Sequence, residues 1–214
     1  MFYDLAKRFI DIVGSIIVIV VFSPLLILIP ILIKLDSPGP VFADIPVRVG
    51  KGRKPFRMYK YRSMIANAHH LLKTDPKFRG LYEKYKKGSY KLSLRDDPRI
   101  TAVGRFSRRF SLDELPQFFN ILKGEMSIVG PRAYYPDELK EQQRVYPESE
   151  KHIQELLTVK PGVTGYWQVT GRSEINFDKR VKMDADYAKR RSIIQDIVII
   201  FKTPWAMLSG KGAI

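Results

Sequence analysis

Hydrophobic and polar positions are unevenly distributed along this chain, and the strongest pattern lies near the N-terminus. Residues 12–33 carry no charge and consist mostly of Ile, Val and Leu. As a straight helix, these 22 residues are roughly 33 Å long, about the thickness of the hydrocarbon core of a bilayer. Ser23-Pro24 falls at the midpoint, and a proline removes a backbone donor and clashes with the preceding turn. The pattern predicts a membrane-associated helix that breaks near Ser23.

Charged residues flank this run on both sides. Lys7 and Arg8 precede it and Lys34 follows it. Because basic flanks stay cytoplasmic, a helix–break–helix that enters and leaves by one face satisfies both the charges and the proline. A kinked spanning helix fits the residues equally well, since such helices tolerate proline. A secretory signal peptide fits poorly, because Asp4 and Asp11 dilute the basic start and no small-residue cleavage site follows.

Shorter periodic segments follow the linker at residues 37–40, and no second uncharged run of about 20 residues occurs. Strands over 47–49 and 56–61 around a glycine turn predict a β-hairpin. Helical spacing is present in residues 111–123, 136–157 and 177–191, and 64–92 fit an exposed helix with a loop. The apolar stretch 193–201 fits either a helix lying at the membrane interface, with Trp205 at headgroup level, or an ordinary buried helix.

The charge of the chain is concentrated in one half. Of the 37 Lys and Arg and 22 Asp and Glu that give the net charge of +15, residues 1–110 contain 22 and 8. The excess positive charge of this half predicts an anionic partner such as nucleic acid, phospholipid or a phosphorylated substrate. The chain has no Cys, which excludes a disulfide scaffold, a thiolate zinc site and a Cys nucleophile.

The sequence Ser111-Leu112-Asp113-Glu114 supports two interpretations. In the structural one, Ser111 caps a helix and Glu114 reaches back to its backbone. Against it, five arginines precede the sequence, at positions 95, 99, 105, 108 and 109, and capping does not need them. Adjacent carboxylates also repel each other. Beside arginines and a helix N-terminus, Asp113 fits an ionised carboxylate nucleophile, and Glu114 fits an oxygen ligand for Mg²⁺.

Two later loops place an arginine close to glycine. In Gly130-Pro131-Arg132 the turn presents a guanidinium that can hold a phosphate by two parallel bonds, although a plain surface turn explains the same residues. Residues 165–172 combine aromatic side chains with Gln168 and Arg172. That combination suits a nucleotide or a sugar, but it is weak evidence alone.

Several familiar motifs are missing. The chain has no phosphate-binding G-x-x-x-x-G-K-S/T loop, no dinucleotide fingerprint and no H-E-x-x-H. Adjacent His69 and His70 point about 100° apart on a helix, so they make a poor shared metal site. The basic hairpin with interleaved aromatics has no accompanying nucleic-acid signature, and attraction to anionic lipid explains it as well.

Five segments together resemble one known family, the bacterial sugar transferases, which are monotopic polyprenyl-phosphate phosphoglycosyl transferases. They are residues 60–64 (Lys-Tyr-Arg-Ser-Met), 97–105 (Asp-Pro-Arg-Ile-Thr-Ala-Val-Gly-Arg), 111–117 (Ser-Leu-Asp-Glu-Leu-Pro-Gln), 124–132 (Gly-Glu-Met-Ser-Ile-Val-Gly-Pro-Arg) and 161–172 (Pro-Gly-Val-Thr-Gly, then Gln168 and Gly171-Arg172). The resemblance covers nearly the whole chain, and the length is similar to that of minimal members with a single catalytic domain. One departure is 44–47, where the family usually carries a Gln/Glu/Arg-rich run.

The resemblance implies a fold and an organisation. The fold is mostly α with a small β-hairpin (α+β). Residues 1–36 are expected to form a re-entrant membrane helix broken at Ser23-Pro24, which decides between the two membrane arrangements above. Residues 37–214 form the catalytic domain, with interfacial amphipathic helices, on the cytoplasmic face of the bacterial inner membrane.

The resemblance also implies an activity. A phospho-sugar passes from a UDP-sugar to undecaprenyl phosphate with release of UMP, which starts glycan assembly. Asp113 is the expected nucleophile and forms a covalent phospho-sugar, with Glu114 as its partner and both as ligands of Mg²⁺. The expected substrate- and phosphate-binding set is Lys60, Arg62, Arg105, Arg108, Arg109, Pro131, Arg132, Gln168 and Arg172.

The expected partners are the two substrates and anionic lipid headgroups, with no nucleic acid; a homodimer is compatible with the sequence. Two alternatives stay open. Asp113 can act as a general base for direct attack by the lipid phosphate, which predicts no UMP release before the acceptor is added. A non-enzymatic basic membrane module instead predicts no dependence on Asp113, and binding that weakens steeply with salt.

Overall fold

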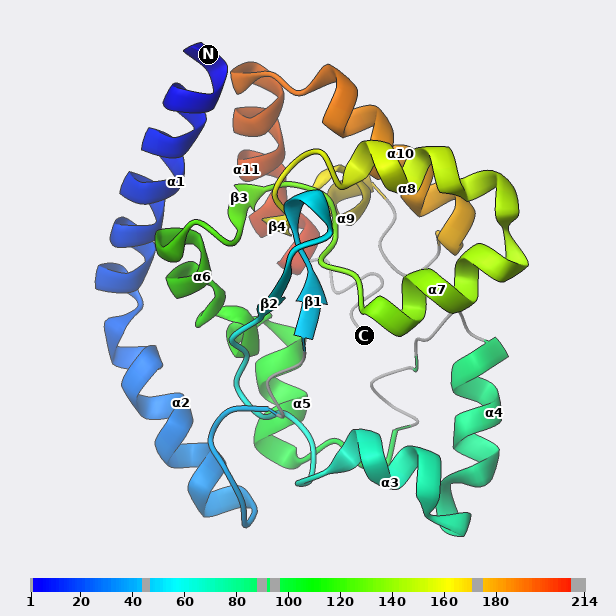
Figure 1. Cartoon of the computed structure of the whole chain (residues 1–214). Coiled ribbons are helices and arrows are strands. Elements are labelled where there is room, and N and C mark those ends of the chain that lie inside the picture. The colour runs from blue at the N-terminus through cyan, green and yellow to red at the C-terminus, as the bar shows by residue number, and fades with distance from the viewer. Residues whose placement is uncertain (1, 44–46, 88–91, 93–96, 171–174, 209–214) are drawn as a thin grey trace.

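The structure is a computed structural model that describes residues 2–43, 47–87, 92, 97–170 and 175–208. The helices are α1 Phe2–Val21, α2 Ser23–Asp36, α3 Ala68–Thr74, α4 Arg79–Lys87, α5 Ala102–Arg109, α6 Gln117–Lys123, α7 Pro136–Val145, α8 Glu150–Leu156, α9 Tyr166–Thr170, α10 Phe177–Arg190 and α11 Ile193–Leu208. The strands are β1 Val47–Val49, β2 Pro55–Arg57, β3 Ser127–Val129 and β4 Gly162–Thr164. The described chain is mostly helical with two small sheets, as the α+β prediction requires (Figure 1).

The long apolar run forms α1 and α2, which follow one edge of the molecule (Figure 1). They meet at Phe22 with a bend of 61°, and the Ser23 hydroxyl donates to the Val20 carbonyl at 2.8 Å. The predicted break is therefore confirmed, and Pro24 occupies the first turn of α2, where its missing N–H costs nothing. Within the described residues no single helix has the length and apolarity to cross a bilayer, whereas the bent pair together has both.

One face of α1 is polar and is attached to the rest of the protein. The Lys7 ammonium lies 2.7 Å from the Asp196 carboxylate of α11. The Arg8 guanidinium donates to the Ile121 and Leu122 carbonyls at the end of α6. Asp11 accepts hydrogen bonds from both the hydroxyl and the backbone of β3, at Ser127 and Ile128. We call these contacts the anchor joint. They fix α1 against the domain while its other face stays exposed and apolar.

The predicted hairpin is confirmed, although its second strand is shorter than expected. β1 and β2 pair antiparallel with Val47 opposite Arg57, so the strand ends at Arg57 and not at residue 61. A second sheet, absent from the predictions, pairs β3 with β4 in parallel. The sequence reads as two turn-rich loops there, because a pair of three-residue strands has no periodic signature. Close approach of Gly130 to Gly162 permits the pairing, since a Cβ on Gly162 would meet the Gly130 nitrogen at 2.1 Å.

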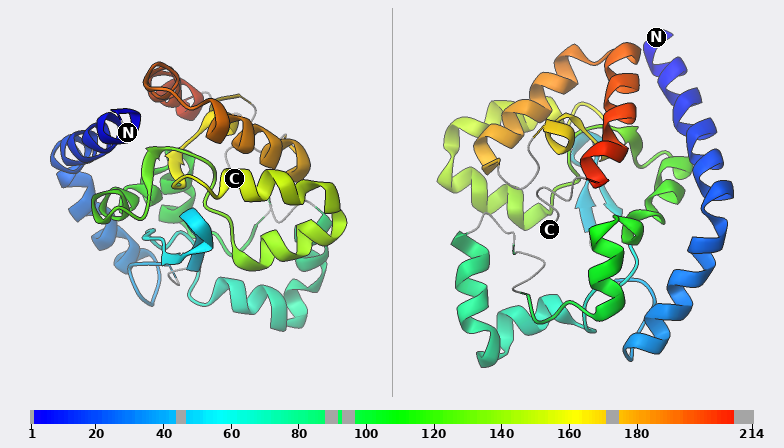
Figure 2. Two further views of the ribbon diagram at one scale, coloured as in Figure 1. Left: turned by 45° about the horizontal axis from the view of Figure 1, so that its top comes forward. Right: turned by 180° about the vertical axis from the view of Figure 1, so that it is seen from behind.

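The C-terminal third supplies a core and a second exposed apolar face. α10 packs against α8 through buried Phe177 and Val181, confirming the amphipathic helix predicted over 177–191. Residues 136–157 form two helices, α7 and α8, with a 3₁₀ turn starting at Pro147 between them. α11 lies beside the start of α1 (Figure 2) and presents Ile194, Phe201 and Trp205 to the outside.

Candidate active site

The two adjacent carboxylates lie on a 3₁₀ turn, Leu112–Glu114, between α5 and α6. The predicted continuous helix over 111–123 is wrong, because α6 begins only after Pro116, at Gln117. The capping box is wrong as well. Ser111 adopts a left-handed conformation with φ of 54° and makes no side-chain cap hydrogen bond. The turn instead buries Asp113. The backbone carbonyl of Asp113 accepts a hydrogen bond from the Tyr61 N–H at 2.9 Å.

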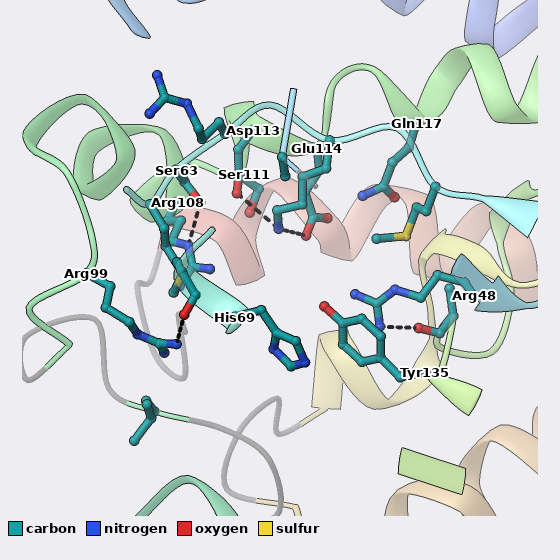
Figure 3. A pocket seen from close by; sticks show the side chains of 18 of the residues that line it. Arg48, Ser63, His69, Arg99, Arg108, Ser111, Asp113, Glu114, Gln117 and Tyr135 are labelled. Atoms are coloured by element: carbon teal, nitrogen blue, oxygen red, sulfur yellow. Dashed lines mark hydrogen bonds and ion pairs between the residues drawn. The ribbon is translucent and has the colours of Figure 1, made fainter. Parts of the chain in front are cut away.

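Lys60 joins the two carboxylates, which Figure 3 shows side by side. Its ammonium lies 3.0 Å from Asp113 Oδ2 and 3.1 Å from Glu114 Oε1. Burial alone lowers the pKa of Lys60, but the two carboxylates outweigh it and the pKa lies above its ordinary value. Asp113 is 1% exposed, and its Oδ2 makes no directional hydrogen bond within the described part of the chain. The contact of this oxygen with Lys60 is therefore described as an ion pair.

The carboxylates and Lys60 line a cavity of ≈ 360 Å³. Arg108 of α5 also lines it and is oriented by the hydrogen bond from its Nε to the Ser63 hydroxyl at 2.8 Å (Figure 3). Arg105 and Arg109 of the same helix are exposed and are not among the lining residues that the structure describes. Of the other two arginines before the turn, Arg99 pairs with Asp97 at 2.6 Å, and Arg95 lies outside the described residues.

Arg132 reaches the cavity from the loop after β3. Its backbone N–H donates to Asp184 at 3.1 Å, and its guanidinium lies 4.0 Å from Glu138, which also accepts from Arg180 at 2.9 Å. Burial lowers the pKa of Arg132. Nearby negative charge, mainly that of Glu138, outweighs burial, so the pKa lies above its ordinary value. Arg132 Nε is buried without a hydrogen-bond partner in the described structure.

Buried charged residues of α10 support the loop that carries Arg132. Arg180 and Asp184 of α10 are both 0% exposed. Burial raises the pKa of Asp184 from 3.8 to about 7, although hydrogen bonds from the Arg132 N–H and the Tyr134 hydroxyl oppose the shift. Pro131 is buried at the parallel sheet, where its carbonyl accepts from the Gly162 N–H at 2.8 Å; it does not line the cavity within the described residues. Pro131 therefore shapes the loop that presents Arg132.

Two further predicted residues are placed differently. Gln168 of α9 lines the cavity; its amide nitrogen donates to the Val163 carbonyl at 3.0 Å, and its Oε1 is buried without a partner in the described chain. The Arg62 guanidinium makes its hydrogen bonds to the end of α2 and the linker, at Ser37, Pro38, Pro40 and Ile33. Arg62 also lines the cavity, but these hydrogen bonds commit its guanidinium to a clamp on the end of the anchor. Arg172 lies outside the described residues.

Sequence reasoning missed one wall of the cavity. Arg48 of β1 is buried, with its guanidinium carbon 3.2 Å from the centroid of the Tyr135 ring. The His69 ring lies nearly parallel to Tyr135, at 11° and 6.3 Å between centroids. Burial lowers the pKa of both Arg48 and His69. Only the basic character of the hairpin signalled Arg48, and nothing in the sequence connects it to residues 69 and 135.

The donor set of the cavity suits a hard cation. Asp113 and Glu114 offer oxygen atoms side by side, and no group of three or more His, Cys, Asp or Glu side chains able to hold a metal occurs in the described residues. Mg²⁺ in proteins is typically bound by one or two carboxylates, with the remaining positions filled by water and substrate phosphates. Two carboxylates beside the cationic side chains of Lys60, Arg108 and Arg132 fit Mg²⁺ bound together with a phosphorylated substrate.

Comparison with known proteins places the chain in a family. The family model described as "Bacterial sugar transferase" matches residues 2–210. The undecaprenyl-phosphate galactose phosphotransferase of Salmonella typhimurium is 43% identical over 211 residues, covering 97% of this chain and 41% of that protein. The exopolysaccharide production protein ExoY of Rhizobium meliloti is 36% identical over 209 residues, covering 98% and 88%.

A third relative is the UDP-N-acetylgalactosamine-undecaprenyl-phosphate N-acetylgalactosaminephosphotransferase of Aeromonas hydrophila. It is 38% identical over 215 residues, covering 99% of this chain and 45% of that protein. The chain spans about two fifths of the length of several of these relatives and most of the length of ExoY. With a family match from residue 2 to residue 210, the chain belongs to the bacterial sugar transferase family.

Proposed function

We propose that this chain transfers a sugar phosphate from a UDP-sugar to undecaprenyl phosphate, releasing UMP and forming an undecaprenyl diphosphate-linked sugar. Three relatives are named for a sugar phosphotransferase acting with undecaprenyl phosphate. The observation that carries the proposal is the buried Asp113 carboxylate in a cavity lined by Lys60, Arg108 and Arg132. A carboxylate among phosphate-binding cations is suited to attack a phosphorus atom.

In the proposed first step, a carboxylate oxygen of Asp113 attacks the phosphorus bonded to the sugar. A bond forms between that oxygen and the phosphorus, and the bond to the bridging oxygen breaks, so UMP leaves with the electron pair. In the second step, a phosphate oxygen of undecaprenyl phosphate attacks the same phosphorus and the Asp113 carboxylate is released. The two displacements use one nucleophile in turn, which gives ping-pong kinetics.

The cations of the cavity stabilise the charge that develops in both steps. Lys60 pairs with Asp113 at 3.0 Å and adds a positive charge beside the phosphorus that Asp113 attacks. Arg108 and Arg132 offer forked donors to the phosphate oxygens and to the leaving UMP. Asp113 and Glu114 hold Mg²⁺, which neutralises further phosphate charge when it is bound.

The helices α1 and α2 determine how close the cavity lies to the membrane surface. We place α1 and α2 as a re-entrant pair on the cytoplasmic face of the bacterial inner membrane, on three grounds: the 61° bend, the exposed apolar face and the exposed Lys34 at the end of α2. The anchor joint keeps Lys7, Arg8 and Asp11 with the domain. The exposed apolar face of α11 lies at the same interface, beside α1. The cavity then opens at the depth of lipid phosphates.

A panel of UDP-sugars tests this function. The full chain in lipid nanodiscs is assayed for UMP release with undecaprenyl phosphate and Mg²⁺. We expect release with at least one UDP-sugar, dependence on both substrates for turnover, and no turnover by Asp113→Asn. Asp186→Asn, an exposed aspartate of α10, is the matched control and keeps its activity. Turnover by Asp113→Asn at the control rate contradicts the assignment of the nucleophile, and absence of release with every UDP-sugar contradicts the function.

A further inference from the structure

The proposed donor contains one group that the catalytic residues do not explain. Its flat uracil base lies a ribose and a further phosphate beyond the phosphorus that Asp113 attacks. The base therefore contacts a wall of the cavity away from Asp113 and Glu114. Proteins commonly hold such bases by stacking them on flat side chains. In Figure 3, Arg48, His69 and Tyr135 lie across the cavity from Asp113.

Tyr135 packs against Arg48 on this wall. The Arg48 guanidinium covers one face of its ring, with the guanidinium carbon 3.2 Å from the ring centroid. Arg48 is itself 6% exposed and donates from Nη1 to the Ala133 carbonyl at 3.1 Å. Its Nε is buried without a partner in the described structure. A buried guanidinium is costly for stability alone, so its use to fix one aromatic ring indicates a binding surface.

His69 adds a second flat surface beside Tyr135. The two rings are nearly parallel, but a separation of 6.3 Å between centroids is near the long end of the range for aromatic pairs, so the imidazole does not cover the phenol ring. Burial, with a contribution from Lys73, lowers the pKa of His69 below its ordinary value. His69 is exposed at the cavity, so its ring face is open to a flat ligand, and the lowered pKa favours the uncharged imidazole.

Two other large rings, Trp167 and Tyr85, also line the cavity, and Trp167 is less available than Tyr135. Trp167 is 5% exposed, and the guanidinium carbons of Arg132 and Arg180 lie 5.7 Å and 5.6 Å from its ring. Tyr135 is half-buried and lines the cavity directly. Its position in the chain, three residues after Arg132, places it next to a side chain that we assign to phosphate binding.

We propose that Tyr135, fixed by Arg48 and flanked by His69, is the stacking surface for the uracil base of the nucleotide donor. This inference rests on the proposed function and deepens it. The surface acts on the donor and on the UMP product, and it makes no contact with the lipid acceptor. It selects for a flat base attached to the phosphates, whichever sugar the donor carries.

Ribose 5-phosphate lacks the base that UMP carries. Comparing the affinities of the two ligands therefore distinguishes the contribution of the base from that of the phosphate. Both are titrated calorimetrically into the full chain in nanodiscs. We expect Tyr135→Leu to weaken UMP binding by about tenfold, the scale of one lost stacking contact, and to leave ribose 5-phosphate binding unchanged. Tyr135→Phe, which keeps the ring, binds UMP like the unmodified chain.

Two histidine variants give a second test that does not alter Tyr135. His69→Ala weakens UMP binding several-fold with no change for ribose 5-phosphate. His70→Ala, at the next and exposed position of α3, is the matched control and leaves both affinities unchanged. These variants keep the inference testable even if Tyr135→Leu does not fold.

Three results overturn the inference. One is UMP binding that is unchanged in both Tyr135→Leu and His69→Ala. Another is equal weakening of UMP and ribose 5-phosphate, which indicates a phosphate or structural role. The third is weaker binding of the intact UDP-sugar with unchanged UMP binding, which assigns the ring to the sugar. Failure of the proposed function appears separately, as absence of UMP release by the unmodified chain with every UDP-sugar.

Discussion

The anchor joint and the cavity both contain buried charged residues, but they treat these residues differently. In the anchor joint every charged side chain has a partner: Lys7 pairs with Asp196, Arg8 caps α6, and Asp11 accepts two hydrogen bonds. In the cavity, polar atoms of Asp113, Arg132, Gln168 and Arg48 are buried without hydrogen-bond partners in the described structure. Burying such groups without hydrogen-bond partners costs free energy. The difference indicates that the joint maintains the fold, whereas the cavity is shaped for a charged ligand.

The strongest contrast is between two buried aspartates. We expect Asp113→Asn to reduce turnover by a thousandfold or more, on the order of other nucleophile replacements, with little loss of stability. Asp11→Asn weakens the hydrogen bonds to β3 and lowers the free energy of unfolding by about 1–2 kcal/mol, but the folded molecules keep their activity. UMP release and thermal unfolding, measured on both variants, check the pair. If Asp113→Asn and Asp11→Asn lose the same activity per folded molecule, the assignment of a structural role to the anchor joint and a catalytic role to the cavity is contradicted.

The parallel sheet connects the two regions, because Asp11 binds β3 and Arg132 follows it. A Cβ on Gly162 would lie 2.1 Å from the Gly130 nitrogen, so Gly162→Ala must separate the strands. We expect a loss of about 2–4 kcal/mol in the free energy of unfolding, with loss of activity. Gly80→Ala on α4 is the control, since its Cβ meets nothing within 4 Å. That variant is expected to be stabilised by about 0.5–1 kcal/mol. Similar stability of the two variants contradicts this account of the sheet.

Two arginines near the cavity sharpen the contrast further. Arg62→Met removes the clamp on the end of α2 and is expected to lower the free energy of unfolding by about 2–4 kcal/mol. Arg108→Met removes a hydrogen-bond donor that we assign to the substrate phosphates. We expect a loss of about a hundredfold in turnover with nearly unchanged stability. Turnover per folded molecule, together with denaturant unfolding, distinguishes the two roles. A hundredfold catalytic defect in Arg62→Met restores the sequence-based assignment of Arg62 to phosphate binding.

The last prediction concerns pH. The pKa of Asp184 is raised from 3.8 in the unfolded chain to about 7 in the folded one, so the folded state binds more protons between these values. The free energy of unfolding therefore falls as pH rises from about 4 to 7, by up to about 1.4 kcal/mol per pH unit from this group. Asp184→Asn removes this slope, whereas Asp186→Asn keeps it. Unfolding midpoints at pH 5, 6, 7 and 8 check the difference, and parallel curves for the two variants refute it.

The sequence predicted the local features of the fold. The break at Ser23-Pro24, the hairpin and α10 all follow from short-range rules of proline stereochemistry, alternation and helical period, and the structure confirms them. The pairing of β3 with β4 joins segments more than 30 residues apart. Short strands without alternation carry no signal for such a pairing, so the sequence shows only two loops.

The sequence indicated the chemistry of single peptide segments but not which distant segments meet. Lys60 lies beside Asp113 and Glu114, whereas the resemblance implies only that Lys60 binds phosphate. The capping interpretation of Ser111 failed because its backbone is left-handed and its side chain makes no cap hydrogen bond. Arg62 and Arg108 are both basic and near the same motifs, and only the positions of the α2 carbonyls and of Ser63 distinguish their roles. The wall of Arg48, His69 and Tyr135 needs three separate elements.

A single-turnover experiment without acceptor tests the central claim, that the buried Asp113 carboxylate is the nucleophile. The full chain in nanodiscs is mixed with the active UDP-sugar and Mg²⁺, and the reaction is quenched and examined for UMP and for the mass of the protein. The account predicts a burst of about one UMP per active site and a mass increase of one phospho-sugar on the peptide containing Asp113, both absent in Asp113→Asn. UMP release that begins only when undecaprenyl phosphate is added, with no change in the mass of the protein, contradicts it.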